Sequence, residues 1–260
     1  MSGWVYAGRW ALVTGASAGI GEALARELAA RGMHVALSAR REDRLRALAG
    51  EIEAAHGVRT AVVPADLSEE GAAARLWTAA GEEGRAIHLL VNNAGFGSKA
   101  EFLAIALHRQ TEMVRLNCIA PMELMHLALG AGTPGVVNVA SIAGYQPVPM
   151  MAAYSASKAF LMTLSEAVGE ELRGSGTRIV TVNPGPVATE FQQVAGTEVN
   201  ARTLGIRTPQ QVVAAALEAL EAGTGTVVPG FPNRLGAVAV RVAPRSLVLK
   251  AAKKMMKAFR

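Results

Sequence analysis

Short apolar runs alternate with amphipathic stretches along most of the chain. Apolar runs typical of buried strands occupy residues 10–14, 33–38, 58–64, 87–91, 135–139, 178–182 and 225–228. Helical periodicity occupies residues 20–31, 42–56, 69–83, 102–129, 154–172 and 209–222. Strands that alternate with helices in this way are typical of a parallel sheet. The pattern therefore predicts an α/β fold, a doubly wound Rossmann-type parallel sheet of about seven strands with helices on both faces.

Length and composition indicate one large domain. The chain has 260 residues, of which 51% are hydrophobic and 18% are charged, enough for a single buried core. We assign residues 1–230 to this domain and residues 231–260 to a basic C-terminal extension. No run reaches the roughly 18 apolar residues of a membrane span, and the first residues do not resemble a signal peptide, so we expect a cytoplasmic protein.

Cys118 is the single cysteine and no histidine accompanies it at ligand spacing, so we expect no metal.

The net charge of +5 is concentrated near the C-terminus. Residues 234–260 contain eight lysines or arginines and no acidic residue, whereas the rest of the chain has 18 basic and 21 acidic residues. A nucleic-acid-binding domain would need a basic face and a recognisable binding motif in its body. We therefore expect no nucleic-acid partner.

A glycine-rich segment follows the first predicted strand and leads into the first predicted helix. It consists of Gly15-Ala16-Ser17-Ala18-Gly19-Ile20-Gly21. Glycine lets the backbone turn tightly and approach a pyrophosphate, and the amides at the start of a helix favour an anion there. The spacing differs from the general Gly-x-Gly-x-x-Gly fingerprint of dinucleotide-binding proteins, so by itself this segment is also compatible with a plain turn.

The same segment matches the Gly-x-Ser-x-Gly nucleophile elbow of hydrolases, with Ser17 in the nucleophile position. That arrangement needs an upstream strand and loop to complete the oxyanion hole, and only 14 residues precede Gly15. The aspartates are Asp43 and Asp66 alone, and no histidine follows His126, so a catalytic triad would be confined to the first half of the chain. We therefore set the hydrolase interpretation aside.

Arg40 and Arg41 follow the second predicted strand. An NAD-dependent enzyme usually has an acidic residue here for the ribose hydroxyls, whereas a cation here can pair with the 2′-phosphate of NADP. The two arginines thus favour NADP(H), although exposed arginines at the start of the next helix would give the same pattern.

Polar motifs follow several later strands, at the edge where open parallel sheets bind ligands. They are Asp66-Leu67, Asn92-Asn93-Ala94-Gly95, Ser141, Tyr154 with Lys158, and Asn183-Pro184-Gly185 with Thr189. In this order and at these intervals the motifs resemble the short-chain dehydrogenase/reductase family, from about residue 10 to about residue 229. The resemblance implies a single-domain NADP(H)-dependent oxidoreductase that transfers a hydride between the nicotinamide and a carbonyl or alcohol. Residues 1–230 would then be one dinucleotide-binding and catalytic domain.

The resemblance implies a catalytic set of Asn117, Ser141, Tyr154 and Lys158. Tyr154 and Lys158 are four residues apart on one helical face, so the ammonium can lie beside the phenol and lower its pKa. Tyr154 would act as general acid or base, and the Ser141 hydroxyl would hold the substrate oxygen. Pro121 has no N–H, which frees the carbonyl of Asn117 for a water that, in the family, leads to the lysine.

The resemblance also implies which residues contact the cofactor. The residues expected around the pyrophosphate and ribose are Gly15, Ser17, Gly19, Ile20 and Gly21, and those at the 2′-phosphate are Arg40 and Arg41. The adenosine is expected to contact Asp66, Leu67, Asn93, Ala94 and Gly95. The nicotinamide ribose is expected to contact Tyr154 and Lys158, and the nicotinamide itself Pro184, Gly185, Val187 and Thr189. The expected substrate pocket is apolar and lined by Phe96, Tyr145, Pro147, Val148, Met150, Met151 and Phe191. Residues 190–207 are expected to form an irregular flap over it.

Other functions would use the same residues. A cofactor-binding protein without turnover would act as a regulator or scaffold, but the intact catalytic set argues against it. Dehydratase or epimerase chemistry on the same four residues stays open. The resemblance further implies a homodimer or homotetramer built on the helices near residues 102–129 and 154–172.

The C-terminal extension has a basic amphipathic pattern from Ser246 onward. Five cations fall on one helical stripe, Lys250, Lys253, Lys254, Lys257 and Arg260, and largely opposite them lie Val248, Ala251, Ala252, Met255, Met256 and Phe259. Two interpretations stay open. Either the apolar side packs on its own domain or a partner subunit, or the helix lies in an anionic membrane interface and makes the protein membrane-peripheral.

Overall fold

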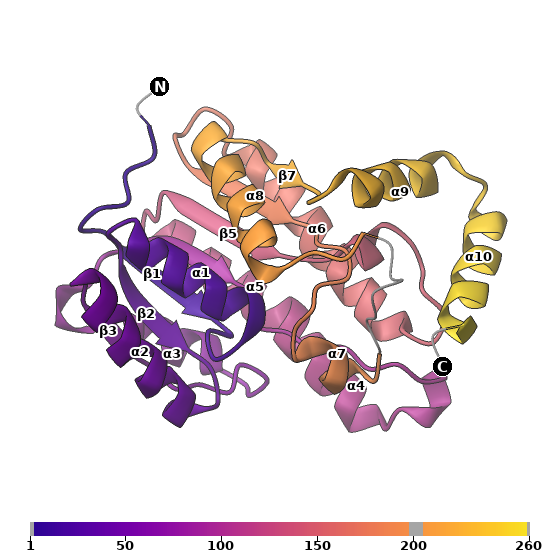
Figure 1. The fold of residues 1–260 in the computed structure, drawn as a ribbon, viewed down its shortest axis with the longest axis horizontal. Helices are drawn as coiled ribbons and strands as arrows, with labels where there is room; N and C mark the ends of the chain where they lie inside the picture. The colour runs from indigo at the N-terminus through magenta and orange to yellow at the C-terminus, as the bar shows by residue number, and fades with distance from the viewer. Residues whose placement is uncertain (1–2, 198–204, 259–260) are drawn as a thin grey trace.

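A computed structural model describes residues 3–197 and 205–258, and Figure 1 shows its fold. Within these residues, seven parallel strands form one sheet in the order β3-β2-β1-β4-β5-β6-β7. The strands are β1 (Trp10–Thr14), β2 (His34–Ser38), β3 (Thr60–Val62), β4 (Ile87–Asn92), β5 (Gly135–Val139), β6 (Arg178–Val182) and β7 (Thr226–Val227). The predicted fold class, a doubly wound α/β sheet, is therefore confirmed.

Both faces of the sheet are buried. Successive residues of a strand point to opposite sides, so Ala11 and Val13 of β1 join one apolar cluster, whereas Trp10 and Leu12 join the other. Since neither face meets water, the strands appear in the sequence as continuous apolar runs and not as an alternating pattern.

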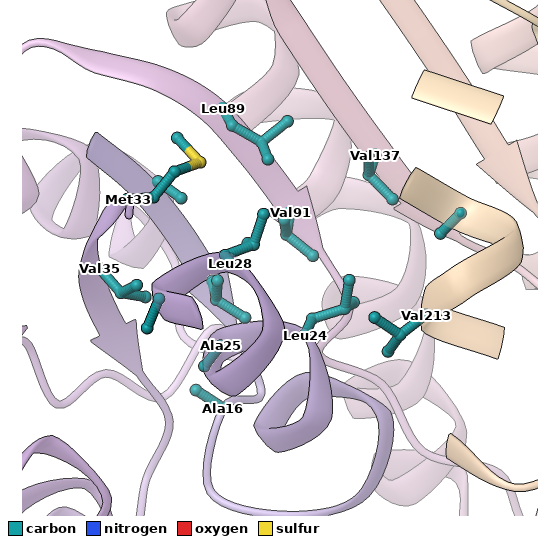
Figure 2. Close-up of a cluster of buried hydrophobic side chains, with 14 of the residues drawn as sticks. Ala16, Leu24, Ala25, Leu28, Met33, Val35, Leu89, Val91, Val137 and Val213 are labelled. Atoms are coloured by element: carbon teal, nitrogen blue, oxygen red, sulfur yellow. The ribbon is translucent and has the colours of Figure 1, made fainter. Parts of the chain in front are cut away.

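Helices cover both faces of the sheet. One layer consists of α1 (Gly19–Ala30), α2 (Glu42–His56) and α8 (Pro209–Ala222), and the other of α3 (Ala72–Ala80), α5 (Ala120–Gly130) and α6 (Ala152–Glu171). Figure 2 shows part of the first layer, where Leu24 and Leu28 of α1 lie in one cluster with Val91 of β4 and Val213 of α8. All four side chains are buried, so this core fixes α1 against the sheet.

The prediction of one continuous helix over residues 102–129 is wrong. A short 3₁₀ helix, η2 (Phe102–Ala104), comes first, and α4 (Leu107–Val114) begins only after a break. Gln110 stabilises this break, because its side-chain amide donates to the carbonyls of Phe102 at 3.0 Å and Ile105 at 3.1 Å. A continuous helix would have bonded these carbonyls internally.

A π-helical segment, η3 (Arg115–Ile119), then joins α4 to α5. The N–H of Ala120 donates to the carbonyl of Arg115, five residues earlier, where an α-helix would use the carbonyl four residues earlier. Pro121 comes next and supplies no N–H, so the α-helical pattern cannot continue unchanged through this point. The apolar periodicity hid both interruptions because it persists across them.

Other boundaries differ from the prediction by a few residues, most of all at β3 and α3, which are shorter than expected. Two short 3₁₀ helices are also present, η1 (Glu82–Gly84) and η4 (Ile142–Tyr145). The predicted irregular flap contains a helix, α7 (Phe191–Ala195), so that prediction is wrong over these residues. Residues 198–204 of the flap lie outside the described part of the chain.

Two helices form the C-terminal extension, α9 (Phe231–Val242) and α10 (Arg245–Ala258). α9 was not predicted, although its apolar residues recur at helical spacing. α10 packs on its own domain, because its Met256 lies in the same buried cluster as Tyr154. Phe259 and Arg260 lie outside the described residues. No helix within the described residues is long and apolar enough to cross a membrane.

Candidate active site

A cavity of about 810 Å³ lies at the carboxyl ends of the strands, where the strand order reverses between β1 and β4. Most residues that the sequence assigned to the site line this cavity: Gly15, Ser17, Gly19, Ile20, Arg40, Arg41, Asp66, Leu67, Asn93, Ala94, Gly95, Ser141, Tyr154, Lys158, Pro184, Gly185, Val187 and Thr189. Gly21 and Asn117 do not line it, but each lies against residues that do.

Backbone crowding requires glycine in the turn after β1. A Cβ at Gly21 would lie 2.3 Å from the carbonyl oxygen of Gly15 and 2.4 Å from Nδ2 of Asn93. Gly15 has a φ of +65°, and a Cβ there would lie 2.9 Å from Cα of Ala94. These distances are shorter than van der Waals contact, so a side chain at either position would push the turn away from the loop after β4.

Hydrogen bonds hold the same two loops together. Thr14 Oγ1 accepts from the backbone N–H groups of Asn93 at 3.0 Å and Ala94 at 3.1 Å. In return, Asn93 Nδ2 donates to the carbonyls of Thr14 at 3.0 Å and Gly15 at 3.2 Å. The loops after β1 and β4 therefore form one braced wall of the cavity.

Polar groups face the cavity at the start of α1 and the end of β2. The N-cap of α1, Ala18, has no side chain that could cap the helix, so the first amides are available to an anion. Ser38 lines the cavity at the end of β2, and its buried hydroxyl has no partner among the described residues. A buried polar atom without a partner is rare, and this one fits a ligand that carries hydroxyl groups, such as a ribose.

The cations after β2 meet an acidic side chain from the loop after β6. Arg41 lies against the glycine turn, where its Nε and Nη2 donate to Ser17 Oγ at 3.2 Å and 3.0 Å. Its Nη1 donates to Glu190 at 2.9 Å, and Arg44 donates to the other oxygen of that carboxylate at 2.7 Å. Hydrogen bonds from Arg44 and Arg41 lower the pKa of Glu190, so the carboxylate stays ionised and ties the start of α7 to these cations.

The Arg40 side chain lies at a different part of the same end of the cavity. Its Nη1 lies 3.7 Å from Asp66 Oδ2 and 3.7 Å from Glu112 Oε1, and its side chain is 60% exposed. Asp66 is oriented by Ser68, whose N–H and Oγ donate to Oδ1 at 3.0 Å and 2.6 Å. Arg41 therefore borders the glycine turn, while Arg40 borders the outer rim of the cavity.

Ser141, Tyr154 and Lys158 lie together at the other end of the cavity. Ser141 follows β5, its Oγ accepts from the N–H of Ala143 at 3.2 Å, and its hydroxyl hydrogen-bonds the Tyr154 phenol. Tyr154 and Lys158 are buried on one face of α6, with Nζ of the lysine 6.0 Å from the centre of the phenol ring. This Nζ donates to the carbonyl of Val139 at 2.9 Å, which fixes its position.

Burial governs the pKa values of this pair. It raises the pKa of Tyr154 to about 12, and the hydrogen bond with Ser141 offsets only part of the increase. It lowers the pKa of Lys158 to about 8. The expected lowering of the Tyr154 pKa is therefore outweighed by burial in this arrangement. Near neutral pH the phenol keeps its proton, which suits a proton donor.

The lowered pKa of Lys158 predicts a pH-dependent stability. Because the folded-state pKa is about 8 and the ordinary value is 10.5, the unfolded chain binds more protons between these pH values. The free energy of unfolding should therefore rise with pH across this interval, by about 2–3 kcal/mol relative to Lys158→Met, which lacks the group. Urea unfolding of both chains at several pH values measures this difference, and a difference independent of pH would contradict the prediction.

Asn117 lies in η3, beneath the wall of the cavity. Its Nδ2 donates to the Phe96 carbonyl and to Ser157 Oγ, both at 3.0 Å, and its Oδ1 accepts from the Phe96 N–H at 3.2 Å. A Cβ at Gly95 would lie 2.9 Å from that Oδ1, so residue 95 must remain small. The Asn117 side chain thus anchors the loop after β4 to α6.

Apolar side chains line the cavity beyond Tyr154. Four of the predicted pocket residues lie there: Phe96, Val148, Met151 and Phe191. The prediction is wrong for three others, Tyr145, Pro147 and Met150, which do not line the cavity. Tyr145 instead faces the scaffold, where its hydroxyl accepts from Asn183 Nδ2 at 3.2 Å.

The helix in the flap lies over the phenol. The ring centre of Phe191, the first residue of α7, is 5.5 Å from that of Tyr154, with the two planes tilted by 48°. At its other end, the carbonyl of Ala195 accepts from the N–H of Lys99 at 2.9 Å. α7 thus bridges the loops after β4 and β6 across the site.

Several cavity residues come from distant segments and were missed by sequence analysis, among them Glu190 and Asn233. Asn233 Nδ2 donates to the carbonyls of Gly205 at 2.9 Å and Pro229 at 3.0 Å. A Cβ at Gly185 would lie 2.5 Å from Asn233 Oδ1, so α9 packs directly against the loop after β6. No motif or spacing signalled these roles, because they depend on how α7 and α9 pack.

Comparison with known proteins agrees with this geometry. The family model described as short chain dehydrogenase matches residues 9–200. A very-long-chain 3-oxoacyl-CoA reductase from Anas platyrhynchos is 38% identical over 197 residues, which are 72% of this chain and 62% of that protein. The match thus spans less than two thirds of the reductase.

Solved structures are similar over most of the chain. A short-chain dehydrogenase from Sphingobium yanoikuyae in complex with NADPH has a TM-score of 0.79 and 30% identity, covering 88% of this chain and 92% of that one. A 7β-hydroxysteroid dehydrogenase has a TM-score of 0.84 and 27% identity, covering 95% of this chain and 97% of that one. Because the family model covers most of the chain and the site lies where these motifs predicted, the chain belongs to the short-chain dehydrogenase/reductase family.

Proposed function

We propose that this oxidoreductase transfers a hydride between NADP(H) and a carbonyl or alcohol, with Tyr154 as the general acid or base. The observation that carries the proposal is the buried group of Ser141, Tyr154 and Lys158 in the same cavity as the glycine turn and the arginines. A cavity of about 810 Å³ is of the size that binds cofactors and their substrates.

The Ser141 hydroxyl interacts with the Tyr154 phenol, and together the two groups would hold the substrate oxygen. In reduction the phenol donates its proton to this oxygen, and in oxidation the phenolate accepts it. Ser141 stabilises the negative charge that develops on the oxygen. A nicotinamide cofactor held in this cavity would supply or accept the hydride that the reaction requires.

Lys158 and Asn117 support the proton transfer. Below its pKa of about 8 the buried Lys158 is cationic, which favours the phenolate once the proton has left Tyr154. Pro121 cannot donate to the Asn117 carbonyl, so this oxygen is suited to hold a water on the path to Lys158. We assign Asn117 a positioning role, since its side chain holds the Phe96 backbone.

The residues present fit a nicotinamide dinucleotide. The turn after β1 presents backbone amides without a capping side chain, which suits the pyrophosphate. The unpartnered Ser38 hydroxyl suits the adenosine ribose, and Arg41 beside Ser17 suits a 2′-phosphate. The similar solved dehydrogenase that contains NADPH supports the same choice of cofactor.

Glu190 is expected to oppose NADP(H) binding. Its carboxylate pairs with Arg41 and Arg44, the cations nearest to the proposed 2′-phosphate site, so an incoming phosphate must compete with it. Glu190→Gln should therefore tighten NADPH binding about two- to fivefold, in keeping with the modest strength of exposed ion pairs, and leave NADH binding unchanged. Fluorescence titration of both cofactors measures the effect.

Glu27→Gln is the matched control, because it removes a carboxylate that pairs with Arg31 on α1, outside the cavity lining. NADPH affinity should not change in this variant. Weaker NADPH binding by Glu190→Gln would show that the carboxylate holds Arg41 in its productive position and does not compete for it.

The substrate is proposed to be an apolar ketone or the corresponding secondary alcohol. Phe96, Val148, Met151 and Phe191 surround the space beside Tyr154, and Met256 of α10 closes it with a further apolar side chain. The names of similar proteins, a very-long-chain 3-oxoacyl-CoA reductase and a 7β-hydroxysteroid dehydrogenase, denote substrates with large apolar parts. The cavity lining and the names of these proteins indicate the same class of substrate.

A panel of aldehydes, ketones and alcohols, assayed at the nicotinamide absorbance band with NADPH and NADH, tests the proposed function. We expect turnover of apolar ketones with NADPH. Cofactor binding without turnover of any member would favour a regulatory or scaffold protein. Product formation without net cofactor oxidation would favour dehydratase or epimerase chemistry on the same residues.

We further propose a homo-oligomer built on α4, α5 and α6. α4 and α6 pack side by side, and large apolar side chains on and beside these helices are exposed: Leu103, Leu107, Val114, Ile119 and Phe160. Exposed apolar surface of this kind is typical of subunit contacts. Light scattering at micromolar concentration should give a dimer or tetramer, and a monomer would contradict the proposal.

A further inference from the structure

α9 carries an apolar stripe on its outer side. Four large apolar residues of this helix are 75%, 59%, 55% and 81% exposed: Phe231, Leu235, Val238 and Val242. Their spacing of four, three and four residues places them in one narrow strip along the helix. The buried residues of α9, Asn233 and Ala237, lie on the opposite side. α9 therefore packs on the domain with one side and presents the apolar stripe outward.

α10 has the reverse arrangement. Its buried residues are Val248, Ala252 and Met256, which recur every four residues on one side. Lys250, Lys253 and Lys254 are exposed and fall on the opposite side of the helix. Val248, Ala252 and Met256 thus pack within the domain and are not available to a membrane. Three other apolar residues of α10, Leu247, Leu249 and Met255, are exposed but are spread around the helix, so α9 alone presents a narrow apolar stripe outward.

Cations dominate the segment that carries the stripe. From residue 234 to residue 260 the chain has eight lysines or arginines and no acidic residue. Arg234, Arg245 and the three exposed lysines of α10 have no acidic partner among the described residues. Figure 1 shows α9 and α10 together at one edge of the molecule, so these charges and the apolar stripe belong to one region.

A lipid surface fits this region better than a second copy of the chain. A twofold contact through the stripe would bring two acid-free segments together, and their cations would repel each other. One strip of four side chains is also small beside the roughly 800 Å² per partner that a stable interface buries. An anionic bilayer interface offers apolar depth to the stripe and negative charge to the cations. We propose that α9 and α10 dock the protein on an anionic membrane, with the α9 stripe inserted among the lipids.

The docking region borders the substrate end of the cavity. Asn233 of α9 and Met255 and Met256 of α10 all line the cavity. An apolar substrate dissolved in the bilayer would therefore enter close to Tyr154 without crossing water. This consequence rests on the proposed function, whereas the docking itself does not.

Co-sedimentation of the full chain with lipid vesicles tests the docking. We expect binding to phosphatidylcholine vesicles that contain phosphatidylglycerol at low ionic strength, weaker binding in high salt, and little binding to phosphatidylcholine alone. Val238→Asp puts a charge in the middle of the stripe and should weaken binding about tenfold or more. Val5→Asp is the matched control, because Val5 is 60% exposed and lies in the N-terminal segment, away from α9; it should bind like wild type.

A second set of variants tests the charges. Replacing Lys250, Lys253 and Lys254 together by Gln should weaken vesicle binding, whereas replacing all three by Arg should preserve it. Equal thermal unfolding of all variants checks that the fold is intact. The proposal is overturned if the wild-type chain does not sediment with anionic vesicles at low salt, or if Val238→Asp binds as tightly as Val5→Asp. If, in addition, Val238→Asp reduces the molar mass measured by light scattering, a second copy covers the stripe.

Discussion

Tyr154→Phe is expected to lower kcat at least about a thousandfold and to change NADPH affinity only a few-fold. The substitution removes the proton that reduction requires and leaves the ring, which packs on Phe191, in place. The raised pKa of Tyr154, about 12, means that the wild-type phenol carries this proton at neutral pH. Stopped assays of turnover and fluorescence titration of NADPH measure the two quantities separately.

Tyr145→Phe provides the matched control. Tyr145 is a partly buried tyrosine whose hydroxyl is also hydrogen-bonded, but it does not line the cavity. The loss of that one hydrogen bond should leave kcat within a few-fold of wild type. If Tyr154→Phe retains most of its activity, Tyr154 is not the general acid, although the family and the fold would be unaffected.

The double variant Arg40→Ala/Arg41→Ala is expected to raise the KM for NADPH about a hundredfold relative to the KM for NADH. Charge-assisted hydrogen bonds to a phosphate contribute roughly 1.5–3 kcal/mol each to binding. NADH has no 2′-phosphate and therefore makes none of these bonds, so its binding should not weaken. Arg41 lies against Ser17 in the glycine turn, whereas Arg40 lies at the rim, so the single variant Arg41→Ala should account for most of the change. Initial rates with both cofactors measure the ratio.

Arg46→Ala is the control for this pair. Arg46 lies on α2, the helix that follows the two arginines, and pairs with Glu42 outside the cavity lining. It should leave both KM values unchanged. Equal increases for NADPH and NADH in the double variant would contradict a 2′-phosphate site and indicate that the arginines only support the local fold.

Most of the sheet and its two helix layers could be predicted from the chain itself. β1, β5 and β6 begin and end where the apolar runs do, because each run is buried on both faces and is bounded by polar or turn-forming residues. The motifs after these strands also pointed to one site, since the carboxyl ends of parallel strands lie at one edge of a sheet. Gly15, Ser141 and Tyr154 therefore line the same cavity, although the first and the last are 139 positions apart in the chain.

The interruptions of predicted helices could not be read from periodicity. The break before Leu107 depends on the Gln110 side chain, and the π-helical segment depends on Pro121 within an otherwise helical pattern. The π-helical segment contains Asn117, whose side chain reaches the loop after β4. Departures from local preference of this kind are expected where a fold builds its functional site.

The sequence by itself determined the fold class, the alternation of strands and helices over most of the sheet, and the motifs that meet at one cavity, because these follow from local periodicity and short motifs. Only the tertiary structure decided that Glu190 reaches Arg41 across 149 positions, and that Met256 closes the substrate end of the cavity. It also decided that Val248, Ala252 and Met256 of α10 are buried, whereas the apolar stripe of α9 is exposed. Such pairings depend on which surfaces meet when the helices pack, and no pattern of neighbouring residues along the chain encodes that choice.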